Sequence, residues 1–376
     1  MTARRLTIVG KTRNTPFWPP ASLADFQYEE ADKVDPSIVV EQPTISLYCV
    51  DHENRQAIFV ELPSDVDLSE APFYYQTQYE AAQSLVAVSY DTLHALADDI
   101  AIDPSRISLV YSTGRCGSTL VSHVLNQADD VYSFAEPDVF SQLAALRGFD
   151  GRNDAEISAL VRDCTKIMCA AVQSLGASKW AIKFRSFGIE LGDLFYQHFP
   201  TANVVFLYRA EVSYSRSAVR TFRLFEPDMQ DIMPDFQKVF SQVARPVAAY
   251  TSTHTAVIPP LELTVCMWVG VMERCLELQA QGVPMFCARY EELKAMPHAV
   301  LDTLFSYCGL TVSDPAAVDK VLAQDSQSGT ELSQMNAQQS TSILTEAHVE
   351  ELHRLVKHYA PTLASDIILP YTFRPS

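Results

Sequence analysis

Apolar runs of strand length alternate with segments of helical spacing along most of the chain. From about residue 105, the run at 107–111 precedes a segment whose apolar residues recur at helical intervals, and the run at 202–208 does the same. Such alternation favours a parallel sheet with helices on both faces, and ligands then bind at the carboxyl ends of the strands. The pattern predicts an α/β fold in which helices flank a central parallel sheet.

The segment ahead of this alternation has a different pattern. Residues 1 to about 40 contain several prolines and little periodicity, which is typical of an irregular strap. Two β-rich runs, 45–50 and 57–62, flank a polar turn and predict a hairpin, and helical spacing follows over residues 74–97. We therefore expect two parts: an N-terminal extension at 1–104, packed on a catalytic domain at 105–376.

The turn that follows the run at 107–111 has the features of a phosphate-binding loop. A helical segment begins behind it, so free backbone N–H groups and the positive end of the helix dipole point at one place. Glycines let an anion approach the main chain closely, although an ordinary glycine-containing turn is the alternative. The candidate anion-binding residues of the loop are Gly114, Arg115, Cys116, Gly117, Ser118 and Thr119.

This loop differs from that of a nucleotide triphosphatase. Ser118 stands where those enzymes have a lysine that reaches the β and γ phosphates, and the basic residue is instead Arg115. The loop resembles the 5′ loop of sulfotransferases that use 3′-phosphoadenosine 5′-phosphosulfate (PAPS), which reads basic, Ser, Gly, Thr, Thr. Cys116 replaces the serine of that pattern.

Three further segments match the same family. Arg209 ends a strand and Ser217 follows on the next helix, eight positions later, which is the family's layout for the 3′-phosphate. The alternative is that Arg209 is a solvated charge at the end of a strand and Ser217 is a neutral residue of the helix. Lys183 ends a short strand, as the family's basic residue does, and Arg289–Leu293 resembles its RYE-x-L segment.

The resemblance covers about residues 105 to 310 and implies a P-loop sulfotransferase-like fold. It also implies a transferase that moves a sulfuryl group from PAPS to a hydroxyl or amine of a small-molecule acceptor. The nucleotide product is adenosine 3′,5′-bisphosphate, and no metal is needed. Arg115 and Lys183 would neutralise the charge that develops on the leaving phosphate.

The reaction needs a proton acceptor, and the resemblance implies Glu136. In the branches of the family that sulfate protein tyrosine, the base is a glutamate 21 positions after the basic residue of the loop, and Glu136 stands 21 positions after Arg115. A carboxylate that merely starts a helix is the alternative. His123, inside the helix after the loop, is the competing base.

Two segments are candidates for substrate contacts. Residues 224–264 interrupt the alternation with several prolines and acidic residues, so they are expected to form an acceptor-binding cap, or else a decorative insertion. Residues 325–330 correspond to the loop that closes over the 3′-phosphate in the family. This segment lacks basic residues, so its hydroxyls and amides would have to serve.

Composition limits the class of protein and the cellular compartment that fit the chain. The chain has 376 residues, of which 48% are hydrophobic, so it contains enough apolar residues for a large core. No apolar run approaches the roughly 20 residues that span a bilayer, and the N-terminus lacks a signal-peptide core. Its eight scattered cysteines form neither paired motifs nor a zinc pattern. We expect a cytoplasmic protein with reduced thiols, no metal and no membrane partner.

The formal net charge of −18 argues against nucleic acid as a partner. Basic residues nevertheless gather in the proposed donor-binding motifs, and Arg216, Arg220 and Arg223 are predicted to share one helical face, which is either a basic pocket or a solvated face. A P-loop kinase and a non-catalytic nucleotide-binding protein remain the alternative functions. The sequence does not indicate the oligomeric state.

Overall fold

The structure, a computed structural model, describes residues 2–13, 19–327, 330 and 337–374. The chain divides into two compact units. Unit 1 comprises Met1–Ser108, Asp130–Phe184 and Leu191–Ala202, and unit 2 comprises Leu109–Asp129, Arg185–Glu190 and Asn203–Ser376. Each unit is therefore built from segments that are distant in the sequence.

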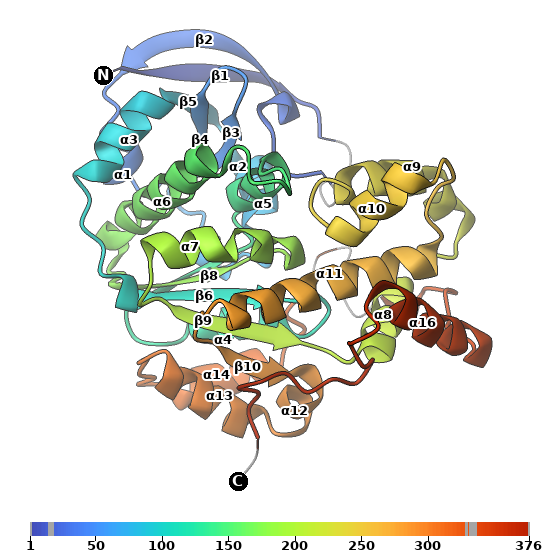
Figure 1. Cartoon of the computed structure of the whole chain (residues 1–376). Helices are drawn as coiled ribbons and strands as arrows, with labels where there is room; N and C mark the ends of the chain where they lie inside the picture. The colour runs from blue at the N-terminus through green and yellow to red at the C-terminus, as the bar shows by residue number, and fades with distance from the viewer. Residues whose placement is uncertain (1, 14–18, 328–329, 331–336, 375–376) are drawn as a thin grey trace. The chain divides into compact units, whose positions relative to one another are not determined.

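Unit 1 contains the N-terminal strands and two strands from the middle of the chain (Figure 1). Its elements are β1 (Ala3–Lys11), β2 (Phe26–Val34), α1 (Ile38–Glu41), β3 (Ile45–Asp51), β4 (Gln56–Glu61), α2 (Tyr74–Ala81), β5 (Ser84–Ser89), α3 (Tyr90–Asp98), β7 (Val131–Ala135), α5 (Asp138–Leu146), α6 (Asp154–Ala171), β8 (Lys179–Lys183) and α7 (Gly192–His198).

Unit 2 is mostly helical. Its elements are most of β6 (Ile107–Ser112), then α4 (Ser118–Leu125), β9 (Asn203–Tyr208), α8 (Glu211–Thr221), α9 (Pro227–Phe240), α10 (Arg245–Thr253), α11 (Pro260–Ala280), β10 (Phe286–Arg289), α12 (Tyr290–Ala295), α13 (Pro297–Tyr307), α14 (Pro315–Leu322) and α16 (Glu346–Tyr359).

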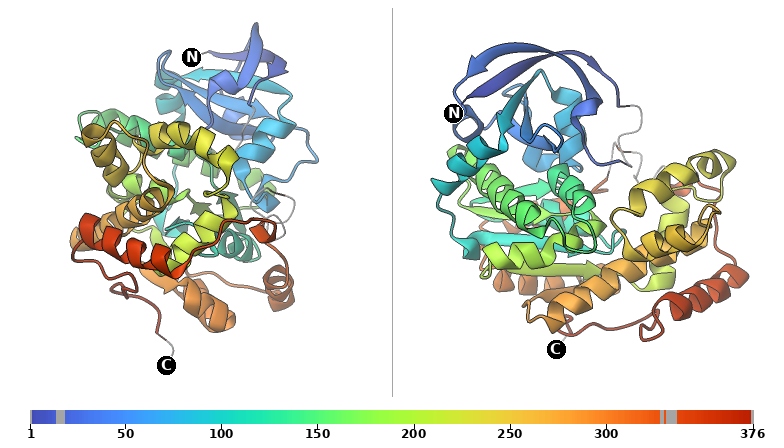
Figure 2. Two further views of the ribbon diagram at one scale, coloured as in Figure 1. Left: turned by 90° about the vertical axis from the view of Figure 1, so that its right-hand side faces the viewer. Right: turned by 45° about the horizontal axis from the view of Figure 1, so that its top comes forward.

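A five-stranded antiparallel sheet lies within unit 1, in the order β2-β1-β5-β4-β3. The predicted hairpin is confirmed: β3 pairs with β4 in a register that opposes Leu47 to Phe59. β1 and β2 lie side by side as two long strands (Figure 2). Both faces of β4 and β5 are buried, so these central strands supply much of the core of unit 1.

The prediction that residues 1–40 form an irregular strap is wrong. Much of the segment is strand: β1 pairs with β5, where Leu6 opposes Leu85, and β2 pairs with β1. Ala3 and Leu6 are buried, whereas β2 is an exposed edge strand with several charged residues. Charged residues on an edge strand discourage pairing with other chains. They also interrupt the apolar pattern from which a strand is predicted.

The expected helical region over 74–97 is also wrong in part. α2 and α3 are helices, but β5 lies between them. Its residues Leu85, Val86 and Val88 are buried because the strand pairs with β1 on one side and β4 on the other. A short apolar run that is buried on both faces cannot be distinguished from helix by local periodicity, so only strand pairing identifies it.

The α/β prediction is confirmed. A second five-stranded sheet is parallel and has the order β10-β9-β6-β8-β7, and helices flank it. The strands predicted at 107–111, before Lys183 and at 202–208 correspond to β6, β8 and β9. The 224–264 segment is mostly helical, in α9, α10 and the start of α11.

The cysteines and the helices add two findings. All eight cysteines lie among the described residues, and each is a buried thiol. Within the described ranges, no helix combines the length and the apolar character needed to cross a bilayer.

Leu85→Ala tests the assignment of β5 as a central strand. The Leu85 side chain is fully buried between two paired neighbours, so its truncation leaves a cavity and is expected to lower the free energy of unfolding by about 2–5 kcal/mol. Urea unfolding followed by circular dichroism measures the change. Val9→Ala in β1, whose side chain is 57% exposed, serves as the control and should change stability by less than about 0.5 kcal/mol. A loss at Leu85 no larger than the control's would contradict the assignment.

Candidate functional site

The loop between β6 and α4 carries an unusual run of backbone conformations. Gly114, Arg115 and Gly117 have φ values of 76°, 52° and 81°, in the left-handed region that favours glycine. Gly117 is also the N-cap of α4, and its side-chain-free backbone leaves the first N–H groups of the helix accessible. A backbone turn of this kind before a helix is suited to an anion.

The segment that resembles the RYE-x-L motif packs against this loop. A Cβ added at Gly117 would lie 3.2 Å from Cδ2 of Leu293 and 3.6 Å from Cδ2 of Tyr290. Both residues belong to α12, which follows β10 directly, as predicted for residues 289–293. Glycine is therefore required at position 117 for its conformation and for the close approach of α12.

Three predicted anion-binding residues come together in unit 2. The Arg115 guanidinium donates through Nε to Ser217 Oγ at 3.3 Å. Arg209 donates through Nη1 to the carbonyl oxygen of Arg115 at 2.8 Å and through Nε to Ser213 Oγ at 2.6 Å. We name Arg115, Arg209 and Ser217 the arginine cluster. The loop arginine thus lies with the residues predicted for the 3′-phosphate.

The arginine cluster concentrates positive charge. Among the described residues, neither guanidinium forms an ion pair with a carboxylate. Burial, together with the neighbouring positive charge of Arg209, lowers the pKa of Arg115 to about 10. Burial also lowers the pKa of Arg209. The Glu291 carboxylate acts against this shift at Arg209 but forms no ion pair with it among the described residues. Two like charges that lie close together favour the binding of an anion.

Several residues that the sequence did not single out shape the cluster. The Tyr290 ring lies under the Arg209 guanidinium, with Cζ 4.1 Å from the ring centroid, which is a cation–π arrangement. Trp268 of α11 donates through Nε1 to the carbonyl oxygen of Arg209 at 2.9 Å. The resemblance to the RYE-x-L segment includes Tyr290 only as part of that segment. No local pattern indicated Trp268.

Gln327 completes the contacts of Arg115. Its Oε1 accepts a hydrogen bond from Nη1 of Arg115 at 3.0 Å. The residue belongs to the 325–330 segment, which the resemblance associates with the 3′-phosphate. Within that segment, Ser328 and Gly329 lie outside the described residues. The neutral amide of Gln327 leaves the positive charge of Arg115 uncompensated.

Unit 1 holds the other two predicted catalytic residues. Glu136 follows β7 and Lys183 ends β8, and the parallel register places Ala135 opposite Lys183. The Lys183 ammonium group forms an ion pair with the Glu136 carboxylate, and the Glu136 N–H donates to the Lys183 carbonyl oxygen at 2.7 Å. The Lys183 side chain is 3% exposed and that of Glu136 is 14% exposed. A nearly buried carboxylate and ammonium group are thus held as a pair.

Glu136 has a strained backbone. Its φ is 64°, and a non-glycine residue with positive φ is uncommon. Pro137 follows as the N-cap of α5, so the chain leaves the strand and enters a helix within two residues. Strain of this kind persists only where the surroundings enforce it, which is frequent at functional sites.

The remaining basic residues are distributed differently from the prediction. Arg216 and Arg220 lie on α8 and are exposed, and Arg220 donates to the carbonyl oxygen of Ala337. Arg223 does not share their helical face, because α8 ends at Thr221 and Arg223 pairs with Glu226. The competing base His123 is half-buried on α4 of unit 2.

Comparisons with known proteins found similarity only to solved structures. The chain is similar to sulfotransferase STF1 from Mycobacterium tuberculosis H37Rv (14% identity, 72% of this chain and 82% of that chain covered, TM-score 0.38). It is also similar to sulfotransferase STF9 from Mycobacterium avium (14%, 73% and 82%, 0.39) and to the sulfotransferase domain from the curacin biosynthetic pathway (14%, 67% and 96%, 0.40). No protein-family model and no curated protein sequence matches the chain.

Glu211, two residues after Arg209, is a buried carboxyl group at the start of α8. Its Oε1 accepts from Ser215 Oγ at 2.7 Å, while Oε2 has no hydrogen-bond partner among the described residues. Burial raises the pKa of Glu211 to about 7. Burial therefore outweighs the helix dipole, which favours a negative charge at this end.

The raised pKa makes stability depend on pH. The contribution of Glu211 is fully present below the unfolded-state pKa near 4.5 and is lost as pH rises through about 7, because the folded state holds the proton more tightly. At about 1.4 kcal/mol per pKa unit, the loss amounts to about 3 kcal/mol. Urea unfolding from pH 4 to pH 9 measures the free energy of unfolding of the wild type and of Glu211→Gln. The difference in this free energy between the two proteins should narrow at low pH. Parallel profiles would contradict this assignment.

Proposed function

We propose that this protein transfers a sulfuryl group from PAPS to a hydroxyl or amine of a small-molecule acceptor. The observation that carries the proposal is the arginine cluster, which presents two guanidinium groups beside a glycine loop at a helix start and forms no ion pair with a carboxylate within the described ranges. A bisphosphorylated nucleotide has the anionic groups that such donors bind. The order of the four sequence motifs adds support.

The residues of unit 2 suit the binding of the donor. Arg209 and Ser217 would hold its 3′-phosphate, and the backbone N–H groups of the loop, with Ser118 and Thr119, would hold its 5′ end. Arg115 would contribute to both ends of the donor, because its backbone belongs to the loop and its side chain contacts Ser217. No lysine stands in the loop for a γ-phosphate, which disfavours a nucleoside triphosphate as the substrate.

The residues of unit 1 suit the chemical step. The acceptor oxygen or nitrogen attacks sulfur, the bond from sulfur to the bridging phosphate oxygen breaks, and the acceptor loses a proton. Glu136 would take that proton, and Lys183 would stabilise negative charge on the departing phosphate. Since the two side chains are paired in this structure, Lys183 also orients the carboxylate.

The acceptor and the cellular location are further parts of the proposal. The helical 224–264 segment is the proposed acceptor-binding cap, and its acidic residues favour a cationic acceptor. The eight buried cysteine thiols fit the reducing cytoplasm.

A mass-spectrometric screen tests the function directly. The purified protein is incubated with PAPS and a panel of hydroxyl- and amine-bearing metabolites, with magnesium chelated. We expect the mass gain of one sulfuryl group on an acceptor and an equal amount of adenosine 3′,5′-bisphosphate. A parallel incubation contains ATP and magnesium in place of PAPS, and turnover there, with none of PAPS, would favour a kinase instead. Binding of the bisphosphate without turnover of any acceptor would favour a non-catalytic protein.

Arg209→Ala tests donor binding. Removal of a charged partner of phosphate typically costs about 1.5–3 kcal/mol, so the Kd for adenosine 3′,5′-bisphosphate should rise at least about tenfold in isothermal titration calorimetry. The matched control is Arg354→Ala, which removes an exposed arginine of α16 that pairs with Glu351. Equal affinity of the two variants would count against the 3′-phosphate assignment.

Glu136→Gln and Lys183→Ala test the chemical step. Loss of a preorganised donor or of a general base typically lowers the rate by about 10²–10³, so kcat should fall by this factor with the acceptor found in the screen. Each of these substitutions should change the affinity for adenosine 3′,5′-bisphosphate less than Arg209→Ala does. Retention of more than about a tenth of the wild-type kcat by either variant would remove that residue from its role.

A further inference from the structure

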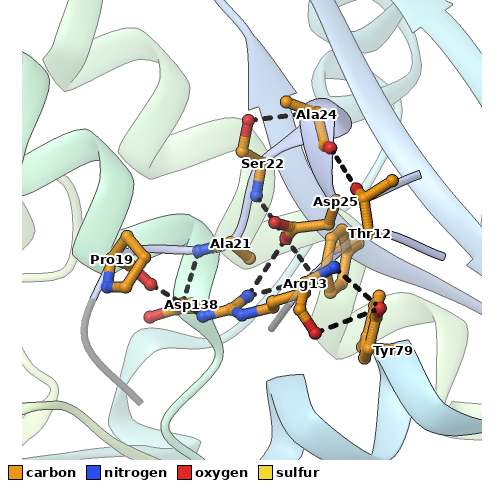
Figure 3. A network of polar contacts seen from close by, with 10 residues as sticks. Thr12, Arg13, Pro19, Ala21, Ser22, Ala24, Asp25, Tyr79 and Asp138 are labelled. Atoms are coloured by element: carbon orange, nitrogen blue, oxygen red, sulfur yellow. Dashed lines mark hydrogen bonds and ion pairs between the residues drawn. The ribbon is translucent and has the colours of Figure 1, made fainter. Parts of the chain in front are cut away.

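A buried polar network in unit 1 is centred on Arg13 (Figure 3). The guanidinium donates through Nη1 to Asp25 Oδ2 at 3.1 Å and through Nη2 to the carbonyl oxygen of Pro19 at 2.7 Å. The Tyr48 hydroxyl donates to the same Asp25 oxygen at 2.6 Å. The Arg13 side chain is only 3% exposed, so these contacts compensate for the removal of its charge from water.

Helix α5 joins this network through Asp138. The Asp138 carboxylate is fully buried, and its Oδ2 accepts from the N–H of Ala21 at 2.6 Å and lies 4.0 Å from Nη2 of Arg13 (Figure 3). One turn further along α5, Gln142 exchanges two hydrogen bonds of 2.7 Å with the main chain of Val50 in β3. Two side chains on one face therefore fasten α5 to the N-terminal part of the unit.

Asp138 stands two residues after Glu136, with Pro137 between them. On the strand side, the Glu136 N–H donates to Lys183, and the paired strands β7 and β8 hold the chain. On the helix side, the Asp138 carboxylate accepts the N–H of Ala21, which ties the first residue of α5 to the N-terminal segment. The strained backbone of Glu136 is therefore enforced from both sides.

We propose that Arg13 and Asp138 are positioning residues that hold the Glu136 carboxylate where it takes the proton of the acceptor. The inference rests on the proposed function, because that function gives Glu136 its role. Asp25 remains the closer ion-pair partner of Arg13, but removal of the Asp138 charge takes the acceptor of the Ala21 N–H out of the buried network, and the start of α5 then loses an anchor. A small displacement of a catalytic group lowers the rate strongly, by up to about 10²-fold.

Asp138→Asn in two backgrounds tests the inference. In the wild-type background, kcat should fall at least about tenfold, while the Kd for adenosine 3′,5′-bisphosphate stays within about twofold. In the Glu136→Gln background, the same change should cost no further activity, because the group that it positions is already absent. Arg13→Lys, which keeps the charge but loses the planar fork, should show the same pattern with a smaller loss. An equal loss of kcat in both backgrounds would overturn the proposal.

Gln78→Leu is the matched structural control. Gln78 is a fully buried polar residue of unit 1 that donates to Ser46 and to the carbonyl oxygen of Leu47, so its loss should lower stability without changing kcat. Hydrogen exchange over residues 131–142 should quicken in Asp138→Asn and stay unchanged in this control. If the wild type transfers no sulfuryl group, the proposed function fails, whereas the exchange measurement still decides the positioning. Unchanged exchange in Asp138→Asn would overturn it.

Discussion

Two positive charges that lie together, with no ion pair to a carboxylate in the described part of the chain, are the constraint on which the arginine cluster depends. Arg209 donates to the backbone carbonyl of Arg115, and the Arg115 side chain reaches Ser217. The surroundings hold this arrangement in place: Trp268 fixes the Arg209 carbonyl, and the Tyr290 ring supports its guanidinium. A pair of buried like charges of this kind favours an anion as its partner, which is the basis of the proposed donor site.

Backbone strain marks both groups of candidate residues. The loop uses left-handed conformations at Gly114, Arg115 and Gly117, and Glu136 adopts one immediately before α5. In each case a charged side chain is presented at the end of a parallel strand, where a helix begins. Non-glycine residues accept this strain because packing and hydrogen bonds around them leave no alternative.

The N-terminal sheet is an integral part of unit 1. β3 contacts α5 through Gln142, and the Arg13 network reaches the first residue of the same helix. Buried polar networks of this kind specify a single arrangement, because each member would be costly to leave unpaired. The segment ahead of residue 105 is thus connected physically to the turn that carries Glu136.

The sequence by itself determined the α/β class, the β3–β4 hairpin, the strands that end at Lys183 and Arg209, and the glycine loop. These features are local: apolar periodicity, turn residues and the spacing of charged residues record them directly. Strands β1, β2 and β5 were missed, because pairing between distant segments, not local pattern, makes them strands. The contacts of Tyr290, Trp268 and Gln327 with the arginine cluster, and those of Arg13 with Asp138, join residues that are far apart in the chain. Only tertiary packing brings such residues within hydrogen-bonding distance, so no one-dimensional pattern could contain them.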